Sequence, residues 1–423
     1  MTPTTTVKFN DYDIIGFDLD NTLLRYNIPE MARLIYDLLA NYLVENYGLS
    51  KELRKPIDDD IDFIQKGLFV DVERGNILHL SKNGYISRAC HGMKELTRDE
   101  ISAAYGPDQV WDIGKKYAVS PLDTWNGPLS RTVRAFLDTF DSPVSLLYAR
   151  VIESVEISKK IEVNKVWSCI LSGLIHIYSR ENYANGKSQY FDAMRSDTKR
   201  YVLKTSPHVI EWLRELRKTK TTYLLTGSHI DFANCTASYA LGKNWRELFD
   251  IVVCFGRKPG FFTMKNNFFN LIDAEEVKEL SSGLKLNEVY SQGNFAMLQK
   301  ALSTKFNLDS PKCLYVGDNV LQDVYTPATF TNSDSIAVIE ELLCELPDSE
   351  HKEGFPYKSK LWGSYFGTIR NPTIWMNFIE KYSAICVPTI DYVAKNSLNH
   401  EYNRFQREEI KLDGFYPHPP KLQ

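Results

Sequence analysis

The sequence predicts an α/β fold with a parallel sheet and a large inserted domain. Short apolar runs that end on acidic or hydroxyl residues recur at residues 14–17, 223–225 and 314–316, as expected for buried strands. Roughly 200 residues separate the first run from the second, which is room for a whole domain. The length of 423 residues also exceeds that of one small domain.

The first apolar run ends in a pair of carboxylates, Asp18 and Asp20, followed by Asn21 and Thr22. Open α/β sheets bind ligands at the carboxyl edge of their strands. Carboxylates at that edge can hold Mg²⁺, and one of them can attack phosphorus to form an aspartyl-phosphate. The alternative is a strand-end turn without chemistry, because Asp, Asn and Thr also satisfy local backbone donors.

Two further runs end on groups that suit a phosphate. Residues 223–225 lead into Thr226 and Ser228, whose hydroxyls could donate to phosphate oxygens. Residues 251–255 are followed by Lys258, an ammonium just beyond a strand tip. Taken alone, the hydroxyls fit an ordinary helix cap and the lysine fits a solvated surface charge.

The last run ends on an acid. Residues 314–316 precede Gly317 and Asp318, with Asp323 five residues further on. A tight turn after a strand would explain this segment by itself. The four segments in this order, however, resemble the four motifs of the haloacid dehalogenase-like (HAD) phosphatases.

Within that superfamily the chain resembles the cytosolic purine 5′-nucleotidase branch, and in it the 5′-nucleotidase domain-containing proteins. The stretches that carry the resemblance are residues 16–30, 257–262, 290–294 and 315–318. The similarity extends from about residue 10 to about residue 345. The resemblance implies a HAD-like Rossmannoid core and a phosphatase activity that uses Mg²⁺.

The resemblance also implies roles for the acids. Asp18 would be the nucleophile that attacks phosphorus. Asp20 would protonate the leaving oxygen, then activate water, and its carbonyl would bind the metal. Asp318 would complete the Mg²⁺ site with Asp18, and Asp323 would orient its neighbours. Because Asp20 supplies the acid that an oxygen leaving group needs, a phosphate ester is favoured over a halogenated substrate.

Substrate contacts are implied for four other residues. Thr226, Ser228 and Lys258 would hold phosphate oxygens, and Phe140 would stack on a nucleobase. Two departures weaken the substrate prediction: Asp141 stands where the purine nucleotidases carry Asn, and Gly227 stands where relatives often carry Asn. The expected substrate is a nucleoside 5′-monophosphate, but these changes put its base in doubt.

The chain is predicted to divide into three parts. Residues 1–27 and 205–345 would form the catalytic core, and residues 28–204 would form a mostly helical cap inserted after the first motif. Residues 32–45 of this cap carry apolar residues at helical spacing, among them Ile35, Leu39 and Leu43. Residues 346–423 would be a C-terminal extension that packs on the core, the cap or a second subunit, because its aromatic residues, among them Trp362 and Trp375, need burial.

Composition fits an enzyme of the cytoplasm. A net charge of −4 gives no reason to expect nucleic acid or an anionic membrane as a partner. The Thr-rich first ten residues lack the apolar stretch of a secretory signal. Seven cysteines without a Cys-x-x-Cys pair argue against a disulfide framework or a zinc site. A homo-oligomer stays open.

The sequence therefore predicts a Mg²⁺-dependent phosphomonoesterase that forms an aspartyl-phosphate. Two alternatives remain at this stage. One is a protein that keeps the fold and the metal pocket but serves in binding or assembly with little turnover. The other is a nucleoside phosphotransferase, since an alcohol could capture the aspartyl-phosphate in place of water.

Overall fold

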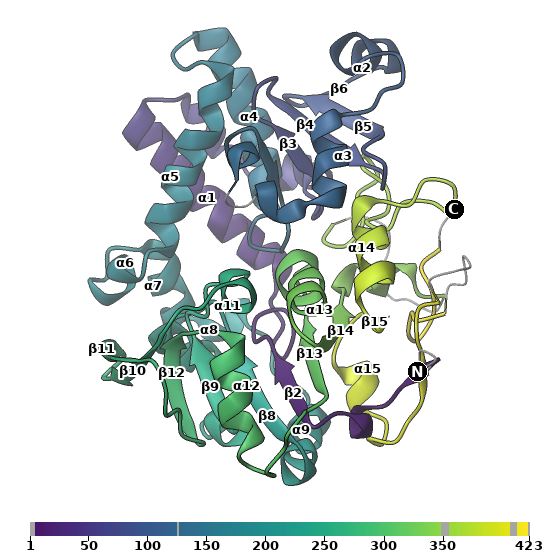
Figure 1. Cartoon of the computed structure of the whole chain (residues 1–423). Coiled ribbons are helices and arrows are strands. Elements are labelled where there is room, and N and C mark those ends of the chain that lie inside the picture. The colour runs from purple at the N-terminus through teal and green to yellow at the C-terminus, as the bar shows by residue number, and fades with distance from the viewer. Residues whose placement is uncertain (1–4, 125–126, 348–354, 407–412, 422–423) are drawn as a thin grey trace. The chain divides into compact units, whose positions relative to one another are not determined.

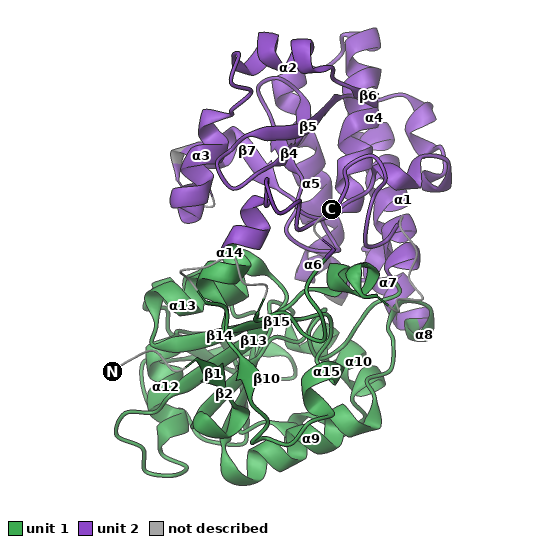
Figure 2. Cartoon of the chain, turned by 90° about the vertical axis from the view of Figure 1, so that its right-hand side faces the viewer, with its two compact units in different colours: residues 1–27, 198–347, 378–420 green, residues 28–197, 348–377, 421–423 purple. Residues whose placement is uncertain are grey.

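The computed structural model describes residues 5–124, 127–347, 355–406 and 413–421. The chain forms two compact units (Figure 2). Unit 1 comprises Met1–Asn27, Thr198–Pro347 and Phe378–Pro420, and unit 2 comprises Ile28–Asp197, Asp348–Asn377 and Lys421–Gln423. The C-terminal residues expected to form one extension are thus divided between the two units. That unit 2 acts as a cap stays a prediction.

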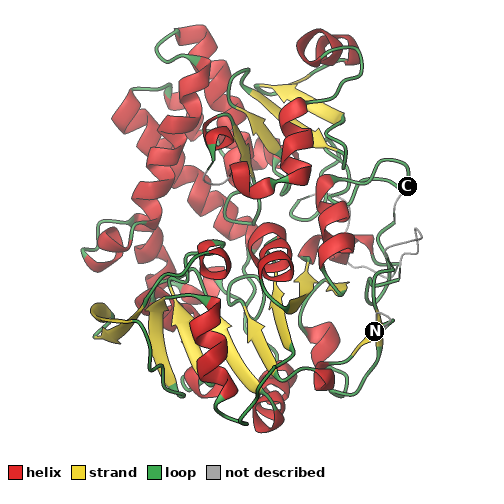
Figure 3. Ribbon diagram, viewed as in Figure 1, coloured by secondary structure: helices red, strands yellow, loops and turns green. Residues whose placement is uncertain are grey.

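Unit 1 is built on a nine-stranded sheet of mostly parallel strands, which confirms the predicted α/β class (Figure 3). The strand order is β11-β10-β12-β9-β8-β2-β13-β14-β15. All neighbours from β12 to β15 pair in parallel, whereas β10 pairs antiparallel with both β11 and β12. The strands are β2 Ile14–Phe17, β8 Thr221–Leu225, β9 Ile251–Cys254, β10 Phe268–Ile272, β11 Glu275–Leu280, β12 Glu288–Gln292, β13 Cys313–Gly317, β14 Ser333–Val338 and β15 Ile385–Val387.

Helices cover both faces of this sheet, which explains why its central strands are apolar throughout. In Figures 1 and 2, α12 and α13 lie on one face and α9 and α10 on the other. Every residue of β2, β8 and β13 is buried, as parallel strands between two helical layers require. The helices of unit 1 are α8 Thr198–Tyr201, α9 Pro207–Thr219, α10 Ile230–Ala240, α11 Gly260–Thr263, α12 Phe295–Ser303, α13 Thr326–Phe330 and α15 Asp391–Ala394.

The strand register brings the motif segments to one edge of the sheet. Phe17 of β2 pairs with Leu224 of β8 and with Val316 of β13. The residues that follow these three positions therefore emerge together at the carboxyl ends of the strands. Gly16 is required in β2, because a Cβ at this position would lie 2.0 Å from Cζ of Tyr223 on the neighbouring strand.

The C-terminal part of unit 1 extends the sheet. Strand β15 pairs in parallel with β14 and forms the end of the sheet. Strand β16, Tyr402–Asn403, pairs antiparallel with β1, Thr6–Val7, near the start of the chain. The sequence did not indicate that residues after 377 would supply strands to the core.

Unit 2 contains helices and a five-stranded antiparallel sheet. The long helix α1, Ile28–Tyr47, buries Ile35, Leu39 and Leu43 on one face, as the spacing predicted. The sheet, of order β6-β5-β4-β3-β7, was not predicted. Its strands are β3 Phe69–Asp71, β4 Asn76–Leu80, β5 Ile86–His91, β6 Lys94–Glu95 and β7 Val133–Ala135. The other helices are α2 Arg98–Tyr105, α3 Asp112–Val119, α4 Pro143–Ser158, α5 Val166–Tyr178, α6 Arg180–Ala184 and α7 Gln189–Ser196, and α14 Ile374–Tyr382 continues from unit 2 into unit 1.

Aromatic residues of the C-terminal part are buried, as their number predicted. Trp362 donates from its indole nitrogen to the Phe63 carbonyl at 2.8 Å, and Trp375 donates to the Gly67 carbonyl at 2.7 Å. Both contacts lie within unit 2. Among the described residues, the helices are all too short or too polar to cross a bilayer.

Candidate active site

Three carboxylates meet at the carboxyl edge of the unit 1 sheet. Asp18 follows β2 directly, Asp318 follows β13, and Asp323 lies on a one-turn π-helix, Val320–Tyr325. One oxygen from each side chain lies within 4.8 Å of the others, and all three residues are buried. Since Asp18 and Asp318 leave adjacent parallel strands, the sheet register alone places them side by side.

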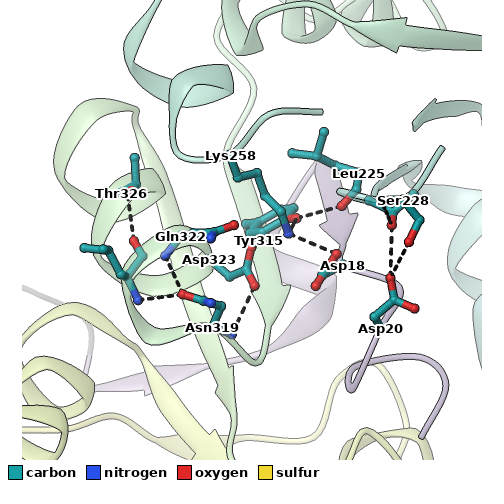
Figure 4. A network of polar contacts seen from close by, with 12 residues as sticks. Asp18, Asp20, Leu225, Ser228, Lys258, Tyr315, Asn319, Gln322, Asp323 and Thr326 are labelled. Atoms are coloured by element: carbon teal, nitrogen blue, oxygen red, sulfur yellow. Dashed lines mark hydrogen bonds and ion pairs between the residues drawn. The ribbon is translucent and has the colours of Figure 1, made fainter. Parts of the chain in front are cut away.

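Lys258 supplies the positive charge at this cluster. Its Nζ lies 2.9 Å from Oδ1 of Asp18 and 2.7 Å from Oδ1 of Asp323, and its side chain is only 4% exposed (Figure 4). Burial by itself lowers the pKa of Lys258, but the charges of Asp18 and Asp323 outweigh it, so the net pKa is raised. Lys258 is therefore an ammonium ion, held between an acid of the first motif and an acid of the fourth.

Asp20 is held by three hydroxyl groups. Its Oδ1 accepts from the Tyr26 hydroxyl at 2.6 Å, and its Oδ2 accepts from Ser228 at 3.0 Å and from Thr226 at 3.3 Å. Burial and the neighbouring charge of Asp18 raise the pKa of Asp20, while the three hydroxyl donors act in the opposite direction. The hydroxyls predicted to bind phosphate thus contact the second acid of the first motif in this structure.

Asp323 is fixed by contacts to both of its oxygens. Oδ1 accepts from Lys258 and Oδ2 accepts from the backbone N–H of Asn319 at 3.1 Å. Burial raises the pKa of Asp323, and the Lys258 charge opposes that shift. The side chain of Asn319 caps the π-helix by accepting from Leu321 N–H and Gln322 N–H. This turn therefore holds Asp323 against Lys258.

Gly317 is needed for this placement of Asp323. A Cβ at position 317 would lie 2.4 Å from Cβ of Asp323, closer than any real contact. At Gly227, in contrast, a Cβ would meet no atom within 4 Å. The departure at Gly227 therefore leaves open space beside the loop between Thr226 and Ser228.

Phe140 lies in unit 2, in the segment between β7 and α4. Its backbone N–H and that of Asp141 both donate to Oδ1 of Asp138, each at 3.0 Å. The Asp141 carboxylate accepts from Arg134 at 2.7 Å. Phe140 is thus not among the predicted site residues that unit 1 brings together, and its contact with a base stays a prediction.

The acidic cluster fits a hard divalent cation. Asp18 and Asp318 offer carboxylate oxygens, the ligand type that Mg²⁺ prefers. Asp323 is less suited as a direct ligand, because both of its oxygens already accept hydrogen bonds from the protein. The donor set therefore accommodates a metal between the first and fourth motifs, with Asp323 supporting Lys258.

Two residues of the site were missed in the sequence. Tyr26 contacts Asp20 although it lies beyond the acidic motif, and the sequence offers no spacing rule that points to it. Tyr315 lies in the buried strand β13, where an aromatic residue is expected in any case. Its hydroxyl is near Nζ of Lys258, at 3.4 Å, and donates to the Leu225 carbonyl at 3.2 Å (Figure 4).

Comparison with known proteins identifies similar chains. A model of the 5′ nucleotidase family matches residues 4–355. The chain is 32% identical over 440 residues to human "5′-nucleotidase domain-containing protein 1", covering 96% of this chain and 95% of that protein. It is 23% identical to rat "5′-nucleotidase domain-containing protein 2" over 75% of this chain and 55% of that protein. A Dictyostelium discoideum 5′-nucleotidase domain-containing protein is also 23% identical, over 94% of this chain and 74% of that protein.

Proposed function

The chain belongs to the 5′-nucleotidase family, and from this premise we propose that it hydrolyses phosphomonoesters, with nucleoside 5′-monophosphates as substrates. One observation carries the proposal: Asp18, Asp318 and Asp323 converge on one point, with the Lys258 ammonium within 3 Å of two of them. Phosphoryl transfer depends mainly on positioning and charge stabilisation. A buried nucleophile beside a buried cation is suited to both.

In the first step Asp18 acts as the nucleophile. One of its carboxylate oxygens forms a bond to phosphorus while the bond from phosphorus to the ester oxygen breaks. Asp20 gives its proton to the departing oxygen, so the nucleoside leaves as a neutral alcohol. The products of this step are an aspartyl-phosphate and an ionised Asp20.

In the second step water cleaves the aspartyl-phosphate. Asp20, now a carboxylate, accepts a proton from water as the water oxygen attacks phosphorus. The bond between phosphorus and Asp18 breaks, and inorganic phosphate leaves. Both residues return to their starting protonation states, so the cycle is closed.

Three other groups would hold the transferring phosphoryl group. Lys258 offsets the repulsion between the Asp18 carboxylate and an anionic substrate, since its ammonium already lies 2.9 Å from Asp18. Thr226 and Ser228 would turn their hydroxyls from Asp20 toward phosphate oxygens. Preorganised donors of this kind are worth about 10²–10³ in rate when one is removed.

Asp18, Asp318 and the Asp20 carbonyl would hold Mg²⁺. The bound ion would neutralise charge on the phosphate oxygens. Asp323 would keep Lys258 in place beside it.

We further propose that unit 2 serves as the cap and that Phe140 contacts the base. All seven cysteines are free thiols, and this supports a cytoplasmic location.

A phosphate-release assay tests the proposed function. The panel comprises nucleoside 5′-monophosphates, sugar phosphates and p-nitrophenyl phosphate, each with Mg²⁺. We expect release from nucleoside 5′-monophosphates, loss of release after chelation, and recovery when Mg²⁺ is restored. Asp18→Asn should abolish release, because an amide cannot act as the nucleophile.

Asp13→Asn is the matched control, because Asp13 lies at the opposite end of β2 and contacts the Lys312 N–H at the surface. It should retain activity. Equal release by the native chain and by Asp18→Asn would refute hydrolysis by this site. Release from sugar phosphates alone would refute the nucleotide substrate.

A further inference from the structure

We propose that Tyr26 is a positioning residue that holds Asp20 in place for proton transfer, and that its bridge to Val202, also in unit 1, fixes Tyr26 for this role. The inference rests on the proposed function, and it extends that function to a residue outside the four motifs. Tyr26 is 2% exposed, and its hydroxyl donates to Oδ1 of Asp20 at 2.6 Å. This is the shortest of the three hydroxyl contacts to Asp20.

The backbone around Tyr26 is fixed by the returning chain. Tyr26 forms an antiparallel bridge with Val202. Asn27 N–H donates to the Tyr201 carbonyl at 2.8 Å, and Leu203 N–H donates to the Arg25 carbonyl at 2.9 Å. These residues flank the points where the chain leaves unit 1, after Asn27, and re-enters it, at Thr198. Two segments of unit 1, one around Tyr26 and one around Val202, are thus hydrogen-bonded to each other beside the contact of Tyr26 with Asp20.

The three donors to Asp20 have different fates during the reaction. Thr226 and Ser228 donate to Oδ2, and in the proposed mechanism their hydroxyls turn to the phosphate oxygens. Tyr26 comes from another element and donates to Oδ1. Of the three contacts, it is therefore the one that persists when substrate is bound.

The same contact determines which oxygen of Asp20 transfers the proton. Once the Thr226 and Ser228 hydroxyls have turned to the phosphate, Oδ1 still accepts the Tyr26 O–H while Oδ2 accepts no hydroxyl, so the proton that Asp20 gives to the leaving group resides on Oδ2. Without Tyr26 the carboxyl group can rotate, and either oxygen can face the substrate. Proton transfer to the leaving oxygen then loses its fixed geometry, whereas attack by Asp18 does not.

Leaving-group dependence tests this role. The alkoxide of a nucleoside is a poor leaving group, so its oxygen must be protonated as it departs. p-Nitrophenolate is a good leaving group and departs with little protonation. Tyr26→Phe should lower kcat/KM for a nucleoside 5′-monophosphate by about 10–100-fold, part of the 10²–10⁴ that general acid catalysis supplies. With p-nitrophenyl phosphate the same variant should lose less than about threefold in kcat/KM. A burst of p-nitrophenolate should appear, because Asp20 also activates the water of the second step.

Tyr12→Phe is the matched control. The Tyr12 hydroxyl donates to Oδ2 of Asp334 at 2.6 Å, and Tyr12 is fully buried in the same unit. It therefore removes a bond of equal length and kind that does not involve Asp20. We expect less than about twofold change with either substrate, because a hydroxyl that does not contact the active-site acids stabilises the fold and not the transition state.

Equal losses with both substrates would overturn the positioning role and indicate a general structural effect. No loss with either would also overturn it. Crystal structures of Tyr26→Phe and Tyr12→Phe with bound beryllofluoride, a phosphoryl mimic that should draw the Thr226 and Ser228 hydroxyls away from Asp20, provide a readout that does not depend on turnover. The Asp20 carboxyl group should change orientation in Tyr26→Phe alone, and an unchanged orientation would refute the inference even if the proposed hydrolysis itself failed.

Discussion

At the scale of single residues, Lys258 shows how charge organises the site. A buried ammonium is costly unless it is paired, and here two carboxylates lie within 3 Å of Nζ. Removing it would leave Asp18 and Asp323 facing each other without a counter-charge. Lys258 therefore stabilises the two buried acids, and in the proposed mechanism it would offset their repulsion of an anionic substrate.

Lys258→Met is expected to lower kcat by about 10²–10³, because the variant lacks the preorganised ammonium that would contact the phosphoryl group. The measurement is the initial rate of phosphate release at a temperature well below the Tm of the variant. Its neighbour Arg257 is exposed and contacts Gln292, so Arg257→Met is the control and should stay within about threefold of the native rate. A similar loss in both variants would show that general surface charge, and not the buried ammonium, accounts for the effect.

At the scale of elements, the segment between β7 and α4 contains a carboxyl group, that of Asp138, whose protonation affects the stability of the fold. Between β7 and α4, Oδ1 of Asp138 accepts two backbone N–H groups. Burial and the charge of Asp141 raise the pKa of Asp138 to about 7, although the two N–H donors and Arg134 act in the opposite direction. In an unfolded chain the pKa of Asp is about 3.9, so the fold favours the neutral carboxyl.

The sign of the pH dependence follows from these two values. The stability that neutral Asp138 contributes is fully present below the unfolded pKa, and it is lost as the pH rises through the folded pKa of about 7. Asp138→Asn keeps the acceptor oxygen and stays neutral. Its Tm relative to the native chain should therefore rise between about pH 5.5 and pH 8, by about 2 °C if about 1 kcal/mol is gained.

Differential scanning fluorimetry at the two pH values measures this change. The exposed Asp112 lies in the first turn of α3, and Asp112→Asn should show the same difference from the native chain at both. A Tm difference for Asp138→Asn that falls with rising pH would contradict the raised pKa.

At the scale of the whole molecule, the parallel sheet depends on residues far from the motifs. All the predicted catalytic acids lie before residue 324, but β15 supplies the last strand of the sheet. Ile336 and Val338 of β14 are buried, with β15 paired alongside them. The C-terminal residues are therefore part of the core that presents the site.

A chain truncated after residue 347 should fail to fold stably, although it retains Asp18, Asp20, Lys258 and Asp318. Loss of β15 leaves β14 as an unpaired, apolar edge, which favours aggregation. Soluble yield and the cooperativity of thermal unfolding measure the effect. A control truncation after Pro420 removes only three residues and should behave as the full chain does. A soluble, cooperatively unfolding 1–347 chain would show that the first eight strands suffice.

The sequence alone determined the class of fold and the meeting of the motifs. Apolar runs that end on Asp18, Thr226 and Asp318 predict buried parallel strands, and parallel strands present their ends at one edge. That argument needs only local pattern and the geometry of a sheet. The long interval after Asp20 similarly indicated an inserted unit, and the spacing of Ile35, Leu39 and Leu43 predicted its first helix.

Only the tertiary structure decided which groups touch. The contact between Tyr26 and Asp20 depends on a bridge to Val202, and Asp323 is aimed at Lys258 by a π-helix that no sequence period indicates. The sheet of unit 2 and strand β15 likewise form through pairings between segments distant in the chain. Hydrophobic periodicity records which residues a segment buries, whereas the choice of partner is made by packing of the whole chain. The strands could therefore be predicted from their residues, whereas the hydrogen bonds that orient Asp20 and Asp323 could not.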